Sequence, residues 1–147
     1  MKFFIDNIFL IAVVLVSGGA LLFPMLTQRG KRANPADVTL LINRSKATIV
    51  DVREQKDFTL GHLPDAKNIP FAEFDQRKAE LDKFKSKTVV VVCQTGGMRA
   101  SAAASKLTKA GFTDVVILDG GIDAWKKANL PLTKPSPAKS LVKTPAK

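Results

Sequence analysis

The chain has 147 residues, a formal net charge of +10, one cysteine and one histidine. A single cysteine excludes an intramolecular disulfide and suits a reducing compartment. One cysteine with one histidine is too few for a usual metal ligand set, so we expect no metal. The excess positive charge lies mainly in residues 29–32 and 131–147. Because residues 33–130 lack a dense basic stripe with interleaved aromatic residues, we expect no nucleic acid as a partner.

Residues 3–26 are apolar apart from three polar side chains, and residues 8–26 form an uncharged run of 19. Such a run is long enough to cross a hydrocarbon core of about 30 Å at about 1.5 Å per residue. The alternative is a cleavable signal peptide, for which residues 18–20 offer small side chains. The apolar run continues past that point and little positive charge precedes it, which favours an uncleaved single-pass anchor.

Arg29, Lys31 and Arg32 follow the apolar segment and outweigh the charge before it. By the positive-inside rule, the chain beyond the segment is expected in the cytoplasm, at the inner membrane if the source is a bacterium. We expect this basic cluster to contact anionic lipid headgroups. The predicted organisation is therefore a membrane anchor with a basic juxtamembrane segment over 1–32, one folded domain over 33–132, and a disordered basic tail over 133–147.

The middle segment alternates between helix and strand patterns. Asn34 and Pro35 are typical of a helix start, as N-cap and first-turn residues. Apolar and β-branched runs predict four strands, over residues 48–52, 66–69, 88–92 and 114–118. Helical patterns occur around Phe58, over 71–84, over 99–110, and from Gly121 through Trp125. Strands separated by helices predict an α/β fold with a mainly parallel sheet, helices on both faces, and a binding site at the carboxyl ends of the strands.

The segment 88–99 is the strongest indication of chemistry. Cys93 stands where a valine-rich strand ends and a glycine-bearing loop begins, just before a helix. Backbone N–H groups and the positive end of a helix dipole, aimed at one sulfur, favour the thiolate, which is the nucleophilic form. The alternative is a buried structural cysteine. The neighbouring Gly96, Gly97 and Arg99 favour the chemical interpretation.

Four segments together resemble the single-domain rhodaneses, which are sulfurtransferases that handle thiosulfate or persulfides. These segments are Ile49–Arg53 (IVDVR), Phe58–Pro70 (FTLGHLPDAKNIP), Val90–Arg99 (VVVCQTGGMR) and Leu118–Trp125 (LDGGIDAW). They occur in the family's order and at about its spacing, across residues 35–132. The resemblance implies a five-stranded, mostly parallel α/β domain, a cysteine persulfide intermediate, and no metal or organic cofactor.

In this interpretation, Cys93 takes a sulfur atom from a small anionic donor and passes it to a thiol or cyanide, with a protein thiol as one acceptor that fits. N–H groups of the following loop would stabilise the charge on the persulfide, and an arginine would hold the anionic substrate. The expected substrate-binding residues are Gln94, Thr95, Gly96, Gly97, Met98 and Arg99.

Three polar residues are expected to support the site. Asp51 and Arg53 end a strand beside it, and an Asp–Arg pair that braces the loop is favoured over direct catalysis. His62, the only histidine, lies in a turn where its imidazole is expected to tie loops together. A general-base role for this histidine is the alternative.

The loop departs from the common rhodanese pattern in its length. Arg99 lies six residues after Cys93, where that pattern places the arginine five residues after the cysteine. Six is the spacing of dual-specificity phosphatases and arsenate reductases on the same fold, whose wider cradle suits a tetrahedral oxyanion. The loop composition favours the rhodanese side, and no acid to protonate an alcohol leaving group is evident. Phosphate or arsenate chemistry and a non-catalytic, membrane-anchored binding module therefore stay open as alternatives.

Overall fold

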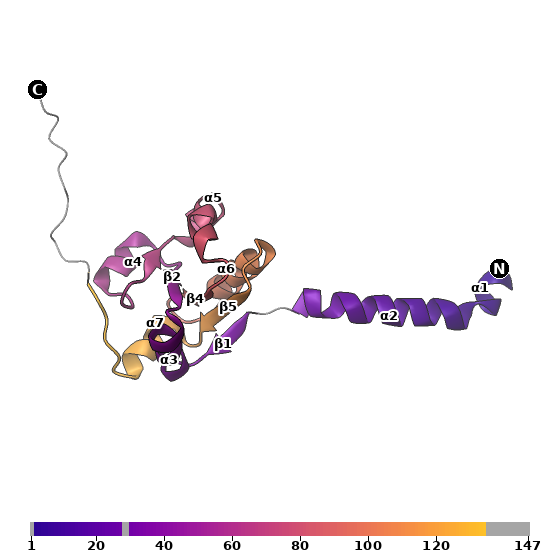
Figure 1. Cartoon of the computed structure of the whole chain (residues 1–147), viewed down its shortest axis with the longest axis horizontal. Coiled ribbons are helices and arrows are strands. Elements are labelled where there is room, and N and C mark those ends of the chain that lie inside the picture. The colour runs from indigo at the N-terminus through magenta and orange to yellow at the C-terminus, as the bar shows by residue number, and fades with distance from the viewer. Residues whose placement is uncertain (1, 28–29, 135–147) are drawn as a thin grey trace, which may run out of the picture.

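A computed structural model of the chain describes residues 2–27 and 30–134, except for the side chains of residues 21–27. The helices α1 (Lys2–Asp6) and α2 (Ile8–Thr27) lie apart from an α/β domain (Figure 1). Among the residues described with their side chains, no helix is both long and apolar enough to cross a membrane. The membrane anchor expected over residues 3–26 is thus not supported by the structure and stays a prediction from the sequence.

The domain is built on a five-stranded sheet in which every pair of neighbouring strands is parallel. The spatial order is β1-β5-β4-β2-β3. Four of these strands match the predicted ones, and the parallel α/β class is confirmed. The strands are β1 (Lys31–Ala33), β2 (Thr48–Asp51), β3 (Lys67–Asn68), β4 (Thr88–Val92) and β5 (Asp114–Leu118).

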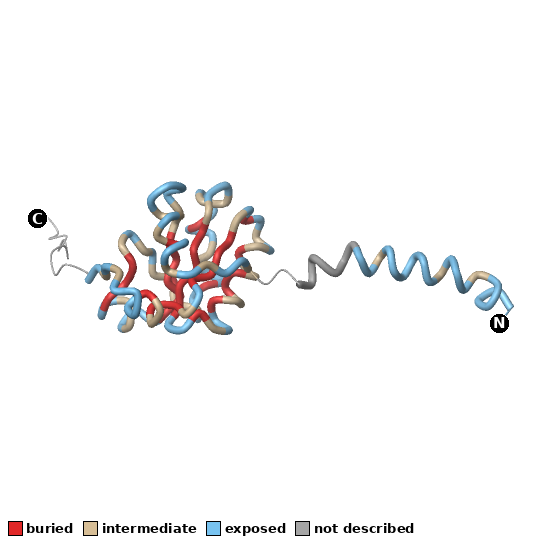
Figure 2. The backbone as a smooth tube through the Cα atoms, turned by 90° about the horizontal axis from the view of Figure 1, so that it is seen from below, coloured by how far each residue is buried: buried red, intermediate tan, exposed pale blue. Residues whose placement is uncertain are grey.

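Helices cover both faces of the sheet because the central strands are apolar on both sides. In β4, Val89 and Val91 pack in one core with α6 (Met98–Lys109), whereas Val90 and Val92 pack in the other. The second core contains residues of α3 (Pro35–Ser45) and α7 (Gly121–Lys127). Buried residues accordingly concentrate in the interior of the domain in Figure 2.

The first helix of the domain begins as its sequence predicts. The Asn34 side chain accepts a hydrogen bond from the Asp37 N–H at 2.9 Å, and Pro35 occupies the first helical position. The Asn34 side chain satisfies one of the N–H groups that a helix start leaves without partners, and Pro35 has no N–H group to satisfy. A second, short helix, α4 (Gln55–Leu60), follows β2 and ends at Gly61.

Residues 71–84 are helical as predicted, but they do not form one continuous α-helix. The chain forms a 3₁₀ turn η1 (Phe71–Glu73), a short α5 (Phe74–Arg77) and a 3₁₀ segment η2 (Lys78–Phe84). The apolar spacing explains the difference, since Phe71 and Phe74 are three residues apart, as are Leu81 and Phe84. A 3₁₀ helix, with 3.0 residues per turn, aligns such pairs on one side.

The folded domain extends beyond both predicted ends. Strand β1 lies in the segment expected to be juxtamembrane, and Lys31 and Arg32 pair with Asp114 and Asp119, each at 3.1 Å. At the other end, His62 and Thr133 exchange two backbone hydrogen bonds of 2.9 and 2.8 Å. From residue 135 onward, the predicted disordered tail lies outside the described residues.

Candidate active site

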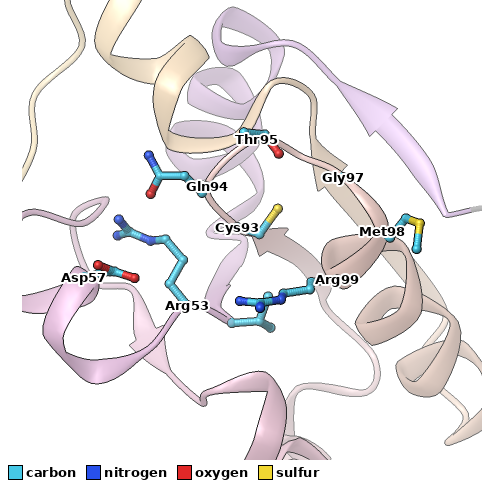
Figure 3. Close-up of a pocket in the computed structure, with 9 residues that line it drawn as sticks. Arg53, Asp57, Cys93, Gln94, Thr95, Gly97, Met98 and Arg99 are labelled. Atoms are coloured by element: carbon cyan, nitrogen blue, oxygen red, sulfur yellow. The ribbon is translucent and has the colours of Figure 1, made fainter.

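Cys93 lies at the carboxyl end of β4 and is 5% exposed. It forms part of the wall of a cavity of about 410 Å³, which Figure 3 shows in close-up. The position agrees with the general rule that open parallel sheets bind ligands beyond the carboxyl ends of their strands. The lining residues are Val52, Arg53, Asp57, Cys93, Gln94, Thr95, Gly97, Met98 and Arg99.

Gly96 brings a backbone donor to the sulfur. Its N–H donates a hydrogen bond to Cys93 Sγ at 3.0 Å. Its φ is +69°, in the left-handed region, and a Cβ there would lie 2.7 Å from the Leu118 carbonyl oxygen. Only glycine therefore fits this position without strain. Gly97 differs, because its φ is −82° and a Cβ there would meet only Thr95 Oγ1, at 3.4 Å.

The turn between β5 and α7 supports the loop from behind. Gly120 and Gly121 both have positive φ, and a side chain on Gly121 would overlap the Cys93 carbonyl oxygen. This close approach lets the Ile122 N–H donate to that carbonyl at 3.0 Å and the Asp123 N–H donate to the Gln94 carbonyl at 3.2 Å. The LDGGIDAW motif thus holds the backbone that follows β4.

A buried ion pair braces the opposite side of the cavity. Arg53 Nη2 lies 2.7 Å from Asp51 Oδ2, and the two side chains are 6% and 1% exposed. The same Nη2 donates to the Gly61 carbonyl at 2.8 Å. Asn68 adds hydrogen bonds from its amide to the backbone carbonyls of Asp51 and Arg53. The end of β2 is thereby tied to β3 and to the end of α4.

His62 lies outside the cavity lining and is bonded within its own turn. Its Nδ1 donates to the Phe58 carbonyl at 3.0 Å, and its ring stacks on the Phe58 ring at a centroid distance of 3.8 Å. The residue is buried. This geometry favours the tie between loops over the general-base alternative, and Asp51 likewise reaches the cavity only through Arg53.

Several residues that line the cavity are polar, and Gln94, Thr95 and Arg99 are exposed. Figure 3 shows Arg53 and Arg99 on different sides of Cys93, with the end of Arg53 turned toward Asp57 and Met98 pointing away. Sequence reasoning did not identify Asp57 as a site residue. The available signal was its place in α4, just after the carboxyl end of β2, on the edge of the sheet where the site forms.

Comparison with known proteins decides the family. The model of the family described as "Rhodanese-like domain" matches residues 34–128, more than half of the chain. The chain belongs to the rhodanese-like domain family. Its parallel α/β fold is therefore that of a rhodanese-like domain, and the family resemblance found in the sequence is confirmed.

Relatives of this rhodanese-like domain include bacterial and archaeal proteins. The protein YibN of Escherichia coli strain K12 is 38% identical over 113 residues, which cover 76% of this chain and 78% of YibN. A rhodanese-related protein of Thermoplasma volcanium is 29% identical, with a TM-score of 0.63 and coverages of 70% and 97%. The thiosulfate sulfurtransferase of Pseudomonas aeruginosa is 26% identical, with a TM-score of 0.61, and the match covers 78% of this chain and 22% of that protein.

Proposed function

We propose that this rhodanese-like domain is a sulfurtransferase that carries a sulfur atom on Cys93 as a persulfide. The observation that supports this best is the hydrogen bond from the Gly96 N–H to the Cys93 sulfur, in the wall of a cavity that Arg53 and Arg99 also line. A backbone donor placed there stabilises negative charge on sulfur, as an oxyanion hole does on oxygen. The similarity to a named thiosulfate sulfurtransferase gives independent support.

The proposed reaction has two displacement steps. The Cys93 thiolate attacks the outer sulfur of thiosulfate, the bond between the two sulfurs of thiosulfate breaks, and its electron pair leaves with sulfite. A thiolate or cyanide then attacks the terminal sulfur of the persulfide, and the electron pair of that S–S bond returns to Cys93. With no second cysteine in the chain, the acceptor must come from outside, as a small thiol or a cysteine of another protein.

The two arginines have different parts in this proposal. Arg53 is held by Asp51 and Gly61, so Asp51 balances its charge and Arg53 serves to fix the wall of the cavity. Arg99 is exposed at the start of α6 and lines the same cavity. Its guanidinium is free to form charge-assisted hydrogen bonds with an anionic donor at the mouth.

The test is the mass of the purified full-length chain after exposure to thiosulfate. We expect a gain of one sulfur atom, removable by cyanide or dithiothreitol. The variant Cys93→Ser should show no gain and no transfer, with an unchanged circular dichroism spectrum. A wild-type chain that gains no sulfur and turns over no donor would contradict the enzyme and favour a non-catalytic binding module.

Hydrolysis of a phosphate ester, or arsenate reduction, is the second candidate, and one observation favours it. Asp57 lines the cavity of Cys93 and Arg99, which supplies a carboxyl group where sequence reasoning found none. Such a group could protonate a leaving alcohol. Deleting Gly97 separates the candidates, because a sulfur-transfer loop should tolerate the shorter length and a phosphate cradle should not. Aryl phosphate hydrolysis faster than sulfur transfer, and lost in Asp57→Asn, would establish this alternative.

We also propose, from the sequence, that residues 3–26 anchor the domain to a membrane with its cavity on the cytoplasmic side. The exposed apolar side chains of α1 and α2 support an apolar environment for them. An extraction series tests this, since an anchored chain stays with membranes in alkaline carbonate. Release by carbonate, or a mature N-terminus near Ala20, would contradict the anchor.

A further inference from the structure

Arg32, at the centre of β1, joins four segments of the chain around the Cys93 loop. Its Nη1 donates to the Gly96 carbonyl at 3.0 Å and to Asp119 Oδ1 at 3.1 Å. Its Nη2 donates to Ser101 Oγ at 3.3 Å. One guanidinium therefore connects β1 with the loop, with the turn after β5, and with the first turn of α6.

We propose that Arg32 is a positioning residue that sets the backbone of Gly96 and Gly97 for chemistry at Cys93. The inference rests on the proposed sulfur-transfer function. Arg32 does not line the cavity, so its effect on the reacting atoms must pass through the loop. The residue it holds, Gly96, is the one whose N–H donates to Cys93 Sγ.

Two geometric arguments support this role. Gly96 is confined on one side by the Leu118 carbonyl and the Gly120 N–H, which an added Cβ would approach to 2.7 and 2.8 Å. On another side, Arg32 holds the Gly96 carbonyl through a hydrogen bond. Because a peptide group is planar, fixing the Gly96 carbonyl also fixes the direction of the Gly97 N–H in the same plane. Gly97 lines the cavity.

Arg32 is expected to affect the loop without contributing much to the folding stability of the domain. Its ion pair with Asp119 has side chains that are 48% and 60% exposed, and exposed pairs contribute little to stability. Replacing Arg32 should therefore leave the domain folded while freeing the loop. The loop length that distinguishes this chain from the common rhodanese pattern gives the loop one more residue to restrain.

The experiment compares Arg32→Ala with two matched variants in the full-length chain. Lys31→Ala removes the neighbouring basic side chain, whose partner is Asp114 at the other end of β5. Asp119→Asn removes the charge of the ion-pair partner and leaves the Gly96 contact in place. For each variant we measure kcat and KM with thiosulfate and cyanide, and hydrogen–deuterium exchange of a peptide spanning the loop.

We expect Arg32→Ala to speed exchange in the loop and to lower kcat by about 10-fold, below the 10²–10³ caused by deleting an oxyanion-hole donor outright. KM should stay within about twofold, because the residue does not touch the substrate. Arg32→Lys keeps the charge without the fork, so it should recover only part of kcat. The two matched variants should behave as the wild type.

The outcomes separate the two proposals. Unchanged loop exchange in Arg32→Ala, or faster exchange with unchanged kcat, would overturn the positioning role. So would full recovery by Arg32→Lys, which would assign the effect to charge alone. If the wild type itself transfers no sulfur while Arg32→Ala still frees the loop, the contact stands as a restraint and the sulfurtransferase proposal is what fails.

Discussion

Two ion pairs of similar composition lie at opposite ends of the strands and differ in burial. We call the carboxyl ends of the strands the carboxyl edge and their amino ends the amino edge. At the carboxyl edge, Asp51 and Arg53 are 2.7 Å apart with side chains 1% and 6% exposed. At the amino edge, Lys31 and Asp114 are 3.1 Å apart with side chains 78% and 34% exposed. Burial decides what each pair does, because water screens the second pair and cannot reach the first. The domain thus places its costly polar groups beside the cavity.

The comparison is tested most severely by removing one carboxylate charge at each edge. Asp51→Asn should lower the free energy of unfolding by about 3–5 kcal/mol, because it leaves the buried Arg53 charge without a counter-ion. Asp114→Asn should lower it by no more than about 1 kcal/mol. Urea denaturation of both variants measures the difference. Equal losses would show that burial does not distinguish the pairs.

The two loop glycines allow the same comparison within the site. Gly96→Ala forces a side chain into a left-handed backbone and against the Leu118 carbonyl, so we expect a loss of about 2–3 kcal/mol in stability. Gly97→Ala has a negative φ and meets only Thr95 Oγ1, at 3.4 Å, but its ψ of −149° lies outside the usual β region. We therefore expect a smaller loss, of about 1 kcal/mol. Thermal melting of both variants measures the difference, and equal losses would contradict the geometry described for the loop.

Arg99, also at the carboxyl edge, is expected to contribute to substrate binding and not to the folding stability of the domain. Arg99 is exposed and lines the cavity, so Arg99→Ala should leave the melting temperature unchanged and weaken transfer from thiosulfate by about 1.5–3 kcal/mol in kcat/KM. A persulfide donor with one negative charge, against the two of thiosulfate, provides the control and should be affected less. Equal losses with the two donors would assign Arg99 a role other than holding the anion.

Much of the carboxyl edge could be predicted because its signals are local. The valine run, the cysteine and the glycines follow one another within 88–99, and each has a direct conformational meaning. Asn34 at a helix start is equally local, and the structure confirms it. The sequence pattern predicted the end of a strand and a helix within the LDGGIDAW segment, but only the family resemblance linked this segment to the site. The structure adds the reason, which is the close approach of Gly121 to the Cys93 carbonyl.

The missed features depend on contacts between residues far apart in the sequence. Strand β1 has only three residues, Lys31–Ala33, with no apolar pattern, and its partner β5 begins at Asp114. Charge alone therefore suggested lipid contact for Lys31 and Arg32. The contact between Arg32 and Gly96 spans 64 positions, and no period or motif indicates it. Asp57 was missed for a similar reason, since only the fold brings α4 over the cavity.

The amino edge should still show a small, pH-dependent effect, which is the finest test of the comparison. Burial of the Asp114 carboxyl group, the largest influence, raises its pKa, but the hydroxyl of Thr88 and the ammonium of Lys31 together hold the pKa below its ordinary value of 3.8. A pKa that is lower in the folded state than in the unfolded chain means that the ionised carboxylate stabilises the fold. That contribution is complete above the unfolded value and disappears as the pH falls through the folded one.

We therefore expect wild-type stability to fall between about pH 5 and pH 3 more steeply than that of Asp114→Asn, which has no proton to take up at this position. Asp75 and Glu80 also have lowered pKa values, caused first by hydrogen bonds from Lys106 and Arg77 respectively. The wild type and Asp114→Asn both keep these two groups, so the acid sensitivity that they cause is the same in both proteins. The difference between the two slopes isolates Asp114, and Lys31→Ala should reduce that difference by removing one of its two partners. Parallel slopes in wild type and Asp114→Asn would show that water screens this edge completely. The two ion pairs would then differ more in their contribution to stability than their distances of 3.1 and 2.7 Å indicate.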